Sequence, residues 1–563
     1  MRSIQTGCWL MVAVWLAGPA AASDAADPAD HLFLGDHIVT LEDGGQSVSA
    51  VAVRAGRIAW VGDREKAAHL RGSHTQIHEL GAHALLPGFV DAHGHLALTA
   101  MTTDTANLAS PPVGPVADLA GLQGELRAYM ATKEIPPGEW VMGFGYDDSL
   151  LKERRHPTRT ELDAVSGEHP IVLLHVSGHL MAGNSLALQT AGITSETPDP
   201  EGGTIRREAD GRTPGGVVEE TATYAFRAVL ARPPTADQFE RAVQAFARHG
   251  VTTIQDGASS PETVAQLEEL DAAGRLKVDV VAYPVGMDPK AIPADFAFGT
   301  RGRLEVPGIK LVLDGSPQGK TAYLSQPYHV PPEGLAADYR GYPILTEPQV
   351  QGIVAHWLGR KIPILAHANG DAAAELLIDA VEAAAPGHDH RTVMIHAQTV
   401  REDQLDRMSR LGIIPSFFST HTFYWGDWHR DSVLGPERAE RISPTRSAMH
   451  RGMHFTVHND APVVPPDMVR LLWATTNRKT RSGRVLGAEQ RLTVEEALRA
   501  MTVEAAYQSF DEADKGSIAV GKQADLVVLS GNPLETAPAE LLELRVEETW
   551  SRGERVFAAP AGD

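Results

Sequence analysis

The stretch "LLPGFVDAHGHL" at residues 85–96 decides how the chain is interpreted, because an apolar run ends there in two histidines. Pro87 and Gly88 mark where the run begins. Side chains two residues apart on a strand point to the same face, so His93 and His95 are predicted to project side by side. Paired imidazoles suit one metal ion, although two histidines at a loop tip would give the same pattern.

Eight strand candidates alternate with helical patterns in the middle of the chain. The strands are 89–95, 251–258, 278–285, 308–315, 362–370, 392–398, 413–419 and 454–462. Helix candidates include 236–250, 347–361 and 400–412. This alternation predicts an α/β fold, a (β/α)₈ TIM-like barrel. An open doubly wound sheet is the alternative, but the strand count and the lack of a glycine fingerprint favour the barrel.

Both ends of the chain have a different sequence pattern, in which short stretches of alternating apolar and polar residues are separated by glycine-rich turns. Such runs predict antiparallel strands and a small β-sandwich built from both termini. The predicted organisation is a β-sandwich at 24–87 plus 507–563, a barrel at 88–506 and an insertion within it at 97–245. The insertion follows the first strand, so it leaves and returns at the carboxyl-end mouth, where barrel active sites lie.

Residues 1–23 are typical of a secretory signal peptide, with Arg2 before a short apolar stretch and small residues after it. The alternative, a membrane anchor, needs a longer apolar stretch. We therefore expect an exported protein, periplasmic or secreted. Cys8 is the only cysteine, so the mature chain has no thiolate ligand. A net charge of −22 argues against nucleic acid or an anionic membrane as partner.

Candidate ligands recur where the predicted strands end. They are His93 and His95 on the first strand, Lys310 and Asp314 on the fourth, His367 on the fifth, His396 on the sixth and Asp460 on the eighth. A lone histidine is more often structural than a ligand. Imidazoles and a carboxylate that converge on one barrel mouth suit Zn²⁺ or a similar divalent ion.

The order His-x-His, Lys, His, His, Asp resembles the metal-dependent amidohydrolase superfamily. Longer stretches are similar to its YtcJ-like branch, amidohydrolase family 3, over about residues 31–557. They include "LLPGFVDAHGHL", "GIKLVLDGSPQGKTAYLSQPY" (308–328), "AHANGDAA" (366–373) and the tail "GSIAVGKQADLVVLSGNPL" (516–534).

The resemblance implies one or two metal ions, with zinc as the expected element. It places His93, His95, Lys310, His367, His396 and Asp460 at the metal centre. Lys310 would be carboxylated on its amine and would bridge two ions. A bare ammonium inside a barrel is costly and repels a cation, whereas a carbamate is anionic. The alternative is a plain ion pair between Lys310 and Asp314, four residues apart.

The chain departs from the family pattern at Ile395, where glutamate is frequent, and at His458 and Asn459, which replace small residues. His458 shares a strand face with Asp460, so we expect it to face the substrate. The motif "HVSGHLMAGNS" (175–185) resembles the branch and suggests substrate contacts by His179 and Asn184. A capped turn inside the insertion is the alternative.

The function that these residues favour is hydrolysis of a non-peptide C–N bond by a metal-bound hydroxide, in an N-acyl or N-formyl amine or an aryl or cyclic amide. Asp460 would take the proton of the water and pass it to the leaving group. An ester or lactone is the runner-up bond, and a catalytically silent binding protein on the same scaffold is the remote alternative. The expected partner is a small-molecule substrate, and a homodimer stays open.

Overall fold

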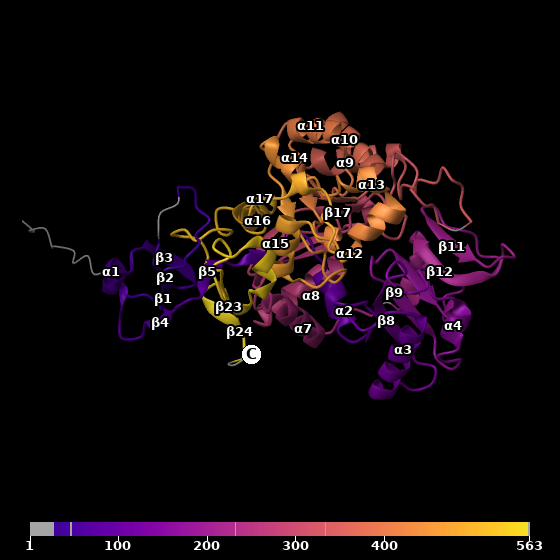
Figure 1. Cartoon of the computed structure of the whole chain (residues 1–563), viewed down its shortest axis with the longest axis horizontal. Coiled ribbons are helices and arrows are strands. Elements are labelled where there is room, and N and C mark those ends of the chain that lie inside the picture. Colours follow the sequence, from indigo (N-terminus) through magenta and orange to yellow (C-terminus); the bar gives the residue numbers. More distant parts are fainter. Residues whose placement is uncertain (1–26, 45–47, 231, 333, 561–563) are drawn as a thin grey trace, which may run out of the picture.

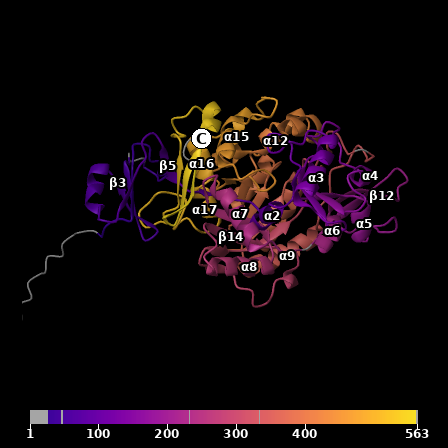
Figure 2. The ribbon, with the colours of Figure 1, turned by 90° about the horizontal axis from the view of Figure 1, so that it is seen from below.

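The computed structural model describes residues 27–44, 48–230, 232–332 and 334–560. The segment predicted as a signal peptide therefore lies outside the described residues. No helix within these ranges is long and apolar enough to cross a bilayer. Figures 1 and 2 show an elongated molecule, with the N-terminal strands at one end and the strands of the predicted insertion at the other.

Eight strands in the middle of the chain correspond to the eight predicted ones, and they run parallel within two sheets. The first sheet contains β6 (Phe89–Val90), β13 (Val251–Ser259) and β14 (Asp279–Pro284). The second contains β17 (Ile309–Val312), β18 (Ile364–Ala368), β19 (Val393–His396), β20 (Ile414–Phe417) and β21 (Thr456–Val457). Within each sheet these strands are neighbours in chain order, so their carboxyl ends lie along one edge.

Backbone contacts connect the two sheets at both sides. A parallel bridge pairs Val285, just after β14, with Lys310 on β17. At the other side, the Asp460 N–H donates to the His93 carbonyl at 3.1 Å. The segment after β21 is thus held against the segment after β6, which brings residues from opposite ends of the chain together.

The predicted helices form close to their expected limits, as α7 (Ala236–Ala247), α9 (Glu347–Gly359) and α11 (Glu402–Leu411). Thr235 caps α7 in a reciprocal capping box with Gln238. Phe239, Val243 and Phe246 lie three to four residues apart on α7 and are buried. The helix period of the sequence therefore becomes an apolar face packed into the central core.

The chain termini supply two small four-stranded sheets. The first has the order β3-β2-β1-β4, with β1 (His31–Leu34), β2 (Ala50–Arg54), β3 (Arg57–Gly62) and β4 (Gln76–Glu79). The second has the order β24-β23-β22-β5, with β5 (Ala84–Pro87), β22 (Leu526–Leu529), β23 (Val546–Ser551) and β24 (Glu554–Ala558). Phe33, Leu526 and Trp550 belong to one apolar core shared by the two sheets.

Residues 97–245 contain a six-stranded sheet of their own, in the order β11-β12-β10-β9-β8-β7. Its strands are β7 (Ala106–Asn107), β8 (Val141–Tyr146), β9 (Ile171–His175), β10 (Leu180–Gly183), β11 (Gly203–Arg207) and β12 (Pro214–Glu220). The strands β8, β9, β11 and β12 lie at the right of Figure 1, far from the N-terminal sheet.

The first strand is shorter than its prediction of 89–95. β6 ends at Val90, and His93 and His95 lie in the loop that follows, where His95 forms an isolated bridge with Asp256. The two imidazoles therefore owe their proximity to a loop rather than to strand alternation.

Candidate metal centre

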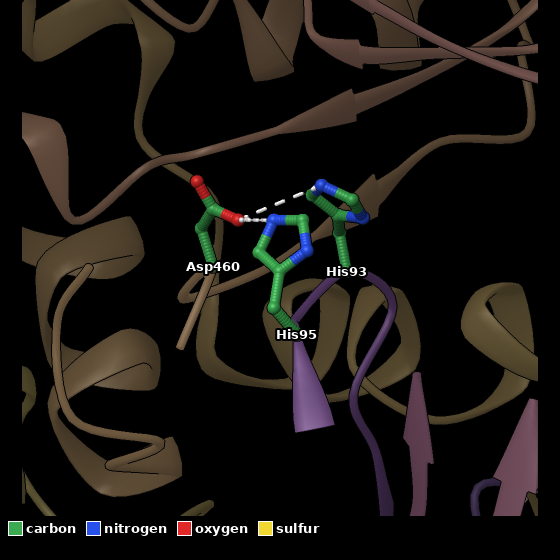
Figure 3. Close-up of side chains that lie close together, drawn as sticks. All are labelled: His93, His95 and Asp460. Carbon is green, nitrogen blue, oxygen red and sulfur yellow. Dashed lines mark ion pairs between the residues drawn. The ribbon is translucent and has the colours of Figure 1, made fainter. Parts of the chain in front are cut away.

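His93, His95 and Asp460 form the centre of the candidate site (Figure 3). Their nearest ligand atoms all lie within 4.8 Å of one another. Oδ1 of Asp460 is 3.0 Å from Nε2 of His95 and 3.5 Å from Nε2 of His93. Both ring nitrogens face the same carboxylate oxygen, as ligands of one cation do.

The Asp460 carboxylate is buried without adequate partners. Although Oδ1 approaches two imidazoles, it accepts no hydrogen bond from any described residue. Asp460 and His396 also have left-handed backbones, with φ of 59° and 71°. Left-handed non-glycine residues cost free energy and cluster at functional sites. A buried carboxylate without a donor fits a cation beside it, and the donor set of two imidazoles and a carboxylate fits zinc.

His93 is oriented by a residue of the neighbouring strand. Its Nδ1 lies 2.7 Å from the side-chain oxygen of Gln255, an acceptor, so Nδ1 carries the proton and Nε2 bears the lone pair. Nε2 lies 3.1 Å from Nζ of Lys310. Burial lowers the pKa of Lys310 to about 7 and holds the pKa of His93 well below its usual range. His93 therefore presents a neutral imidazole to the site.

His367 and His396 form a second pair of ligand atoms. Nε2 of His367 lies 3.2 Å from the carbonyl oxygen of Gly315 and 3.1 Å from the side-chain amide nitrogen of Asn369. Nδ1 of His367 lies 3.0 Å from Nε2 of His396. Two ring nitrogens this close need a proton or a metal ion between them. Burial holds the pKa of both imidazoles well below its usual range.

Asp314 has partners other than Lys310. Its carboxylate accepts backbone hydrogen bonds from Asn369 at 3.0 Å, Gly370 at 2.8 Å and Tyr323 at 2.9 Å. Within the described chain no ion pair joins Lys310 to Asp314. Burial raises the pKa of Asp314 to about 7. Asp314 thus ties loops together, and the Lys310–Asp314 ion pair considered from the sequence is not formed.

His458 lies behind the candidate ligands. Its Nε2 is 3.2 Å from Nδ1 of His396, and its Nδ1 is 2.8 Å from the hydroxyl of Ser416. His458 is fully buried and is absent from the lining of the cavity described below. The structure therefore brings it to His396 rather than to a position where substrate would contact it.

His179 reaches the site from the insertion, as the sequence suggested. Its ring packs against that of His367 with centroids 4.9 Å apart, and its Nδ1 lies 2.7 Å from Oε2 of Glu220. Burial acts to lower the pKa of His179, but the charge and hydrogen bond of Glu220 outweigh it and raise the pKa. Both residues line the cavity.

The structure does not bring Asn184 to the site. Its side-chain oxygen accepts from the backbone N–H of Ile171 and Ala187, and its amide donates to the carbonyls of Ser166 and His169. It is the N-cap of α5 (Ser185–Thr190) and does not line the cavity. Asn184 therefore forms the capped turn that the sequence analysis gave as the alternative to a substrate contact.

A cavity of about 680 Å³ opens onto the candidate ligands. Its lining includes His95, Lys310, His367, His396 and Asp460. The predicted ligands of five different strands or strand ends therefore share one cavity, while His93 lies directly behind it. A volume of this size accommodates a small-molecule substrate.

Sequence reasoning missed several residues around the centre. Gln255 orients His93, and Glu220 orients His179. Asp91 and Asp256 each have a buried carboxylate oxygen without a partner in the described chain, and burial raises the pKa of Asp91 to about 8. Asp91 follows a strand within the opening motif, a signal that could have identified it; Glu220 has no such signal.

A second group of candidate ligands lies in the insertion. Asp147, Asp148 and His175 place ligand atoms within 4.8 Å of one another. Nε2 of His175 lies 3.1 Å from Asp148, and Asp147 accepts from Trp425 at 2.6 Å. Contacts within the group and with Trp425 therefore supply these side chains with partners from the chain itself.

Comparisons with known proteins agree with this geometry. A family model described as "Amidohydrolase family" matches residues 80–557. The chain belongs to the amidohydrolase family, which confirms the resemblance found in the sequence and makes the protein a hydrolase of carbon–nitrogen bonds.

Two relatives and one solved structure illustrate the similarity. The chain is 27% identical to an "N-substituted formamide deformylase" of Arthrobacter pascens, covering 93% of this chain and 97% of the relative. It is 26% identical to "Putative amidohydrolase YtcJ" of Bacillus subtilis (strain 168), covering 93% and 98%. A metal-dependent hydrolase of Pyrococcus horikoshii OT3, described as uncharacterized, shares the fold with a TM-score of 0.71 and 24% identity, covering 90% and 99%.

Proposed function

We propose that the protein hydrolyses a non-peptide C–N bond of a small N-acyl or N-formyl amine, or of an aryl or cyclic amide, at a metal centre. The observation that carries this proposal is the buried Asp460 oxygen facing His93 and His95. The 27% identity to a protein named for deformylation of N-substituted formamides supports the N-formyl amine as the first substrate class to test.

The residues fit a divalent ion, for which zinc is the expected element. His93, His95 and Asp460 would hold one ion, and His367 and His396 a second, with Lys310 between them. When bound, such an ion lowers the pKa of a water molecule and polarises the scissile carbonyl. Hydrogen-bond partners fix the orientation of the ligand imidazoles, as in other metal sites. These partners are Gln255 for His93, the Gly315 carbonyl for His367 and His458 for His396.

Asp460 is the residue proposed to move protons. It lines the cavity, and the carboxylate oxygen that does not hold the ion would accept the proton of the attacking water and then deliver it to the departing nitrogen. The candidate ligand histidines hold lone pairs toward the site and take no part in the transfer. His179 lies beside His367 in the cavity lining, where we expect its Nε2 to contact the substrate.

We also propose that Lys310 is carboxylated on Nζ. Its side chain is buried, and among described residues its contact is the imidazole of His93 rather than a carboxylate. A carbamate there would supply two anionic oxygens between the two groups of imidazoles, and so hold two cations close together. One ion on the histidines and Asp460 is the alternative arrangement.

The architecture proposed for this function is an eight-stranded barrel. The bridge between Val285 and Lys310 and the hydrogen bond between Asp460 and His93 support closure of the two parallel sheets into one ring. The proposed domains are a β-sandwich at 24–87 plus 507–563 and a barrel at 88–506 that includes the insertion. Limited proteolysis with mass spectrometry of the fragments tests these boundaries.

Export remains a proposal based on residues 1–23. Mass spectrometry of periplasmic or secreted material is expected to find a new N-terminus near residue 24, and an intact Met1 on the mature protein would overturn export. A homodimer is the proposed oligomer to test by light scattering.

The central experiment is an assay of N-formyl and N-acyl amines beside matched esters, with metal content measured in the same samples. We expect amide turnover that a chelator abolishes and zinc restores. The same catalytic groups attack an ester or lactone, so faster turnover of esters would favour that second function. Stoichiometric metal without turnover of either class would favour a binding protein.

A further inference from the structure

The cavity wall facing the candidate metal centre is mostly apolar. Side chains from α2 (Leu96–Thr102) and from strands of the insertion form this wall: Leu98, Met101, Met142, Phe144, Leu174 and Met181. A wall of this kind takes an aliphatic or aromatic group and gives it little orientation by itself.

Arg227, on α6 (Tyr224–Leu230), also lines this cavity. Its Nη2 donates to the Gly178 carbonyl at 2.9 Å, and its Nε donates to the Thr223 hydroxyl at 3.3 Å. A guanidinium has five N–H donors in a fixed plane. These two hydrogen bonds orient the guanidinium of Arg227 and leave its other N–H groups free to bind a ligand. Gly178 directly precedes His179, whose ring packs on His367. The guanidinium is therefore tied to the segment that faces the candidate ligands.

Arg227 has no carboxylate partner among the described residues, and neither does Arg232 on the same cavity lining. Other arginines nearby do pair: Arg241 with Asp104, and Arg275 with Glu240 at 2.6 Å. Arg227 and Arg232 are both exposed, so a molecule that enters the cavity can reach them.

The acidic residues of the cavity form no ion pair with Arg227 in the described chain. Glu220 binds His179 through Oε2 while its Oε1 has no hydrogen-bond partner among described residues, and Asp256 accepts from the Ala97 N–H at 3.1 Å through one of its two oxygens. A hydrogen bond from Ser260 lowers the pKa of Glu262. The cavity thus offers a guanidinium that forms no ion pair with a carboxylate of the described chain.

We propose that Arg227 binds a carboxylate of the substrate, so that the preferred substrates are amides that also carry a free carboxylic acid and an apolar group. This inference rests on the proposed hydrolysis. Arginine recognises carboxylates through two parallel hydrogen bonds, and its planar fork gives the substrate an orientation that the apolar wall cannot. In the reaction, water adds its oxygen to the carbonyl carbon, the C–N bond breaks, and the amine leaves with the proton. The carboxylate bound to Arg227 is unchanged.

Matched pairs of substrates that differ only by the carboxylate test the inference. Suitable pairs are N-formylphenylalanine, as both enantiomers, with N-formylphenethylamine, and N-formyl-6-aminohexanoic acid with N-formylpentylamine. For the wild type we expect kcat/KM to favour the acid. In Arg227→Met the ratio of acid to neutral kcat/KM should fall about 10- to 100-fold, the value of a hydrogen bond to a charged group. Arg227→Lys should restore part of the preference for the acid, since the positive charge remains but the planar guanidinium does not.

The control is Arg241→Met, which removes a surface arginine with its own carboxylate partner and should leave the ratio unchanged. An unchanged ratio in Arg227→Met, or a wild type that prefers the neutral amides, would overturn the inference and leave the proposed hydrolysis standing. If the metal-loaded wild type hydrolyses no member of the pairs, this would count against both the carboxylate site at Arg227 and the proposed amide hydrolysis. The ester assay would then show whether the protein is a hydrolase of esters instead.

Discussion

The Nζ atom of Lys310 lies 3.1 Å from Nε2 of His93, although 217 residues separate them in the chain. This contact underlies the first prediction. If Lys310 is carboxylated, metal-stripped protein should regain activity faster with added bicarbonate than without it. Lys310→Ala should lose activity and at least one metal equivalent, and a short carboxylic acid in solution should restore part of the activity. Lys310→Arg should fail, because its guanidinium stays protonated and cannot capture CO₂. An unmodified Lys310 beside a single, fully active metal would refute the two-metal arrangement.

Asp460 is the residue through which proton transfer is proposed. Asp460→Asn keeps the size of the side chain but removes its basicity. We expect kcat to fall by at least about 100-fold, the usual contribution of a general base, with the circular dichroism spectrum unchanged and most metal retained. Steady-state kinetics and metal analysis on the same preparation check this. A kcat near that of the wild type would remove Asp460 from proton transfer.

Glu220 orients His179 through the 2.7 Å contact with its Nδ1. Glu220→Gln preserves volume but replaces the carboxylate acceptor, and we expect kcat/KM to fall about 10-fold, as for other residues that orient groups at a metal site. The loss should not add to that of His179→Asn in the double variant, since both changes remove one unit. Additive losses would show that Glu220 acts independently of His179.

Asn184 is expected to contribute to stability rather than to catalysis. Asn184→Ala removes the cap of α5 and leaves the Ile171 N–H of β9 and the His169 carbonyl before it without this partner. The free energy of unfolding should fall by about 2 kcal/mol, measured by urea denaturation, with kcat/KM retained. A tenfold loss of kcat/KM without a loss of stability would return Asn184 to the substrate site.

His454 and Glu504 give a pH-dependent contribution to stability. Their contact of 2.7 Å raises the pKa of His454, chiefly through the Glu504 hydrogen bond. A raised histidine pKa stabilises the fold below about pH 6.5, and that stability is lost as the pH rises through the folded-state value. Glu504→Gln should therefore destabilise the protein more at pH 5.5 than at pH 8.5, by at most about 1 kcal/mol because the pair is partly exposed.

The matched control for this pH dependence is Glu495→Gln, an exposed glutamate on α16 (Val494–Ala500) without an ion pair among described residues. Its effect on the urea midpoint should be equal at the two pH values. An equal effect of Glu504→Gln at both would show that the His454 contact does not depend on protonation.

Much of the fold could be predicted because its signals are local or periodic. The eight strand candidates and helices such as α7 follow hydrophobic periods that the structure keeps. Strand limits were less accurate, since β6 ends at Val90 while the apolar run continues. Periodicity indicates burial, and the loop that holds His93 and His95 is as buried as a strand.

The candidate site was predictable only where ligands recur at strand ends. His93, His367 and Asp460 share that position, and parallel strands bring such residues together. Contacts across the fold carry no comparable signal. Glu220 meets His179 because β10 and β12 are paired, and the sequence does not state which strands of the insertion are neighbours.

The pairing of β5 with β22 has a consequence for how the protein is made. Leu526 pairs with Pro87, so a strand near the start of the chain waits for a partner that is synthesised 439 residues later. At about 5–20 residues per second the delay is roughly 20–90 s, during which β5 lacks its partner β22, although Leu85 can already bridge to Ile38 and β6 can pair with β13 much earlier. The sheet that joins the two ends of the chain can therefore be completed only after translation is almost finished.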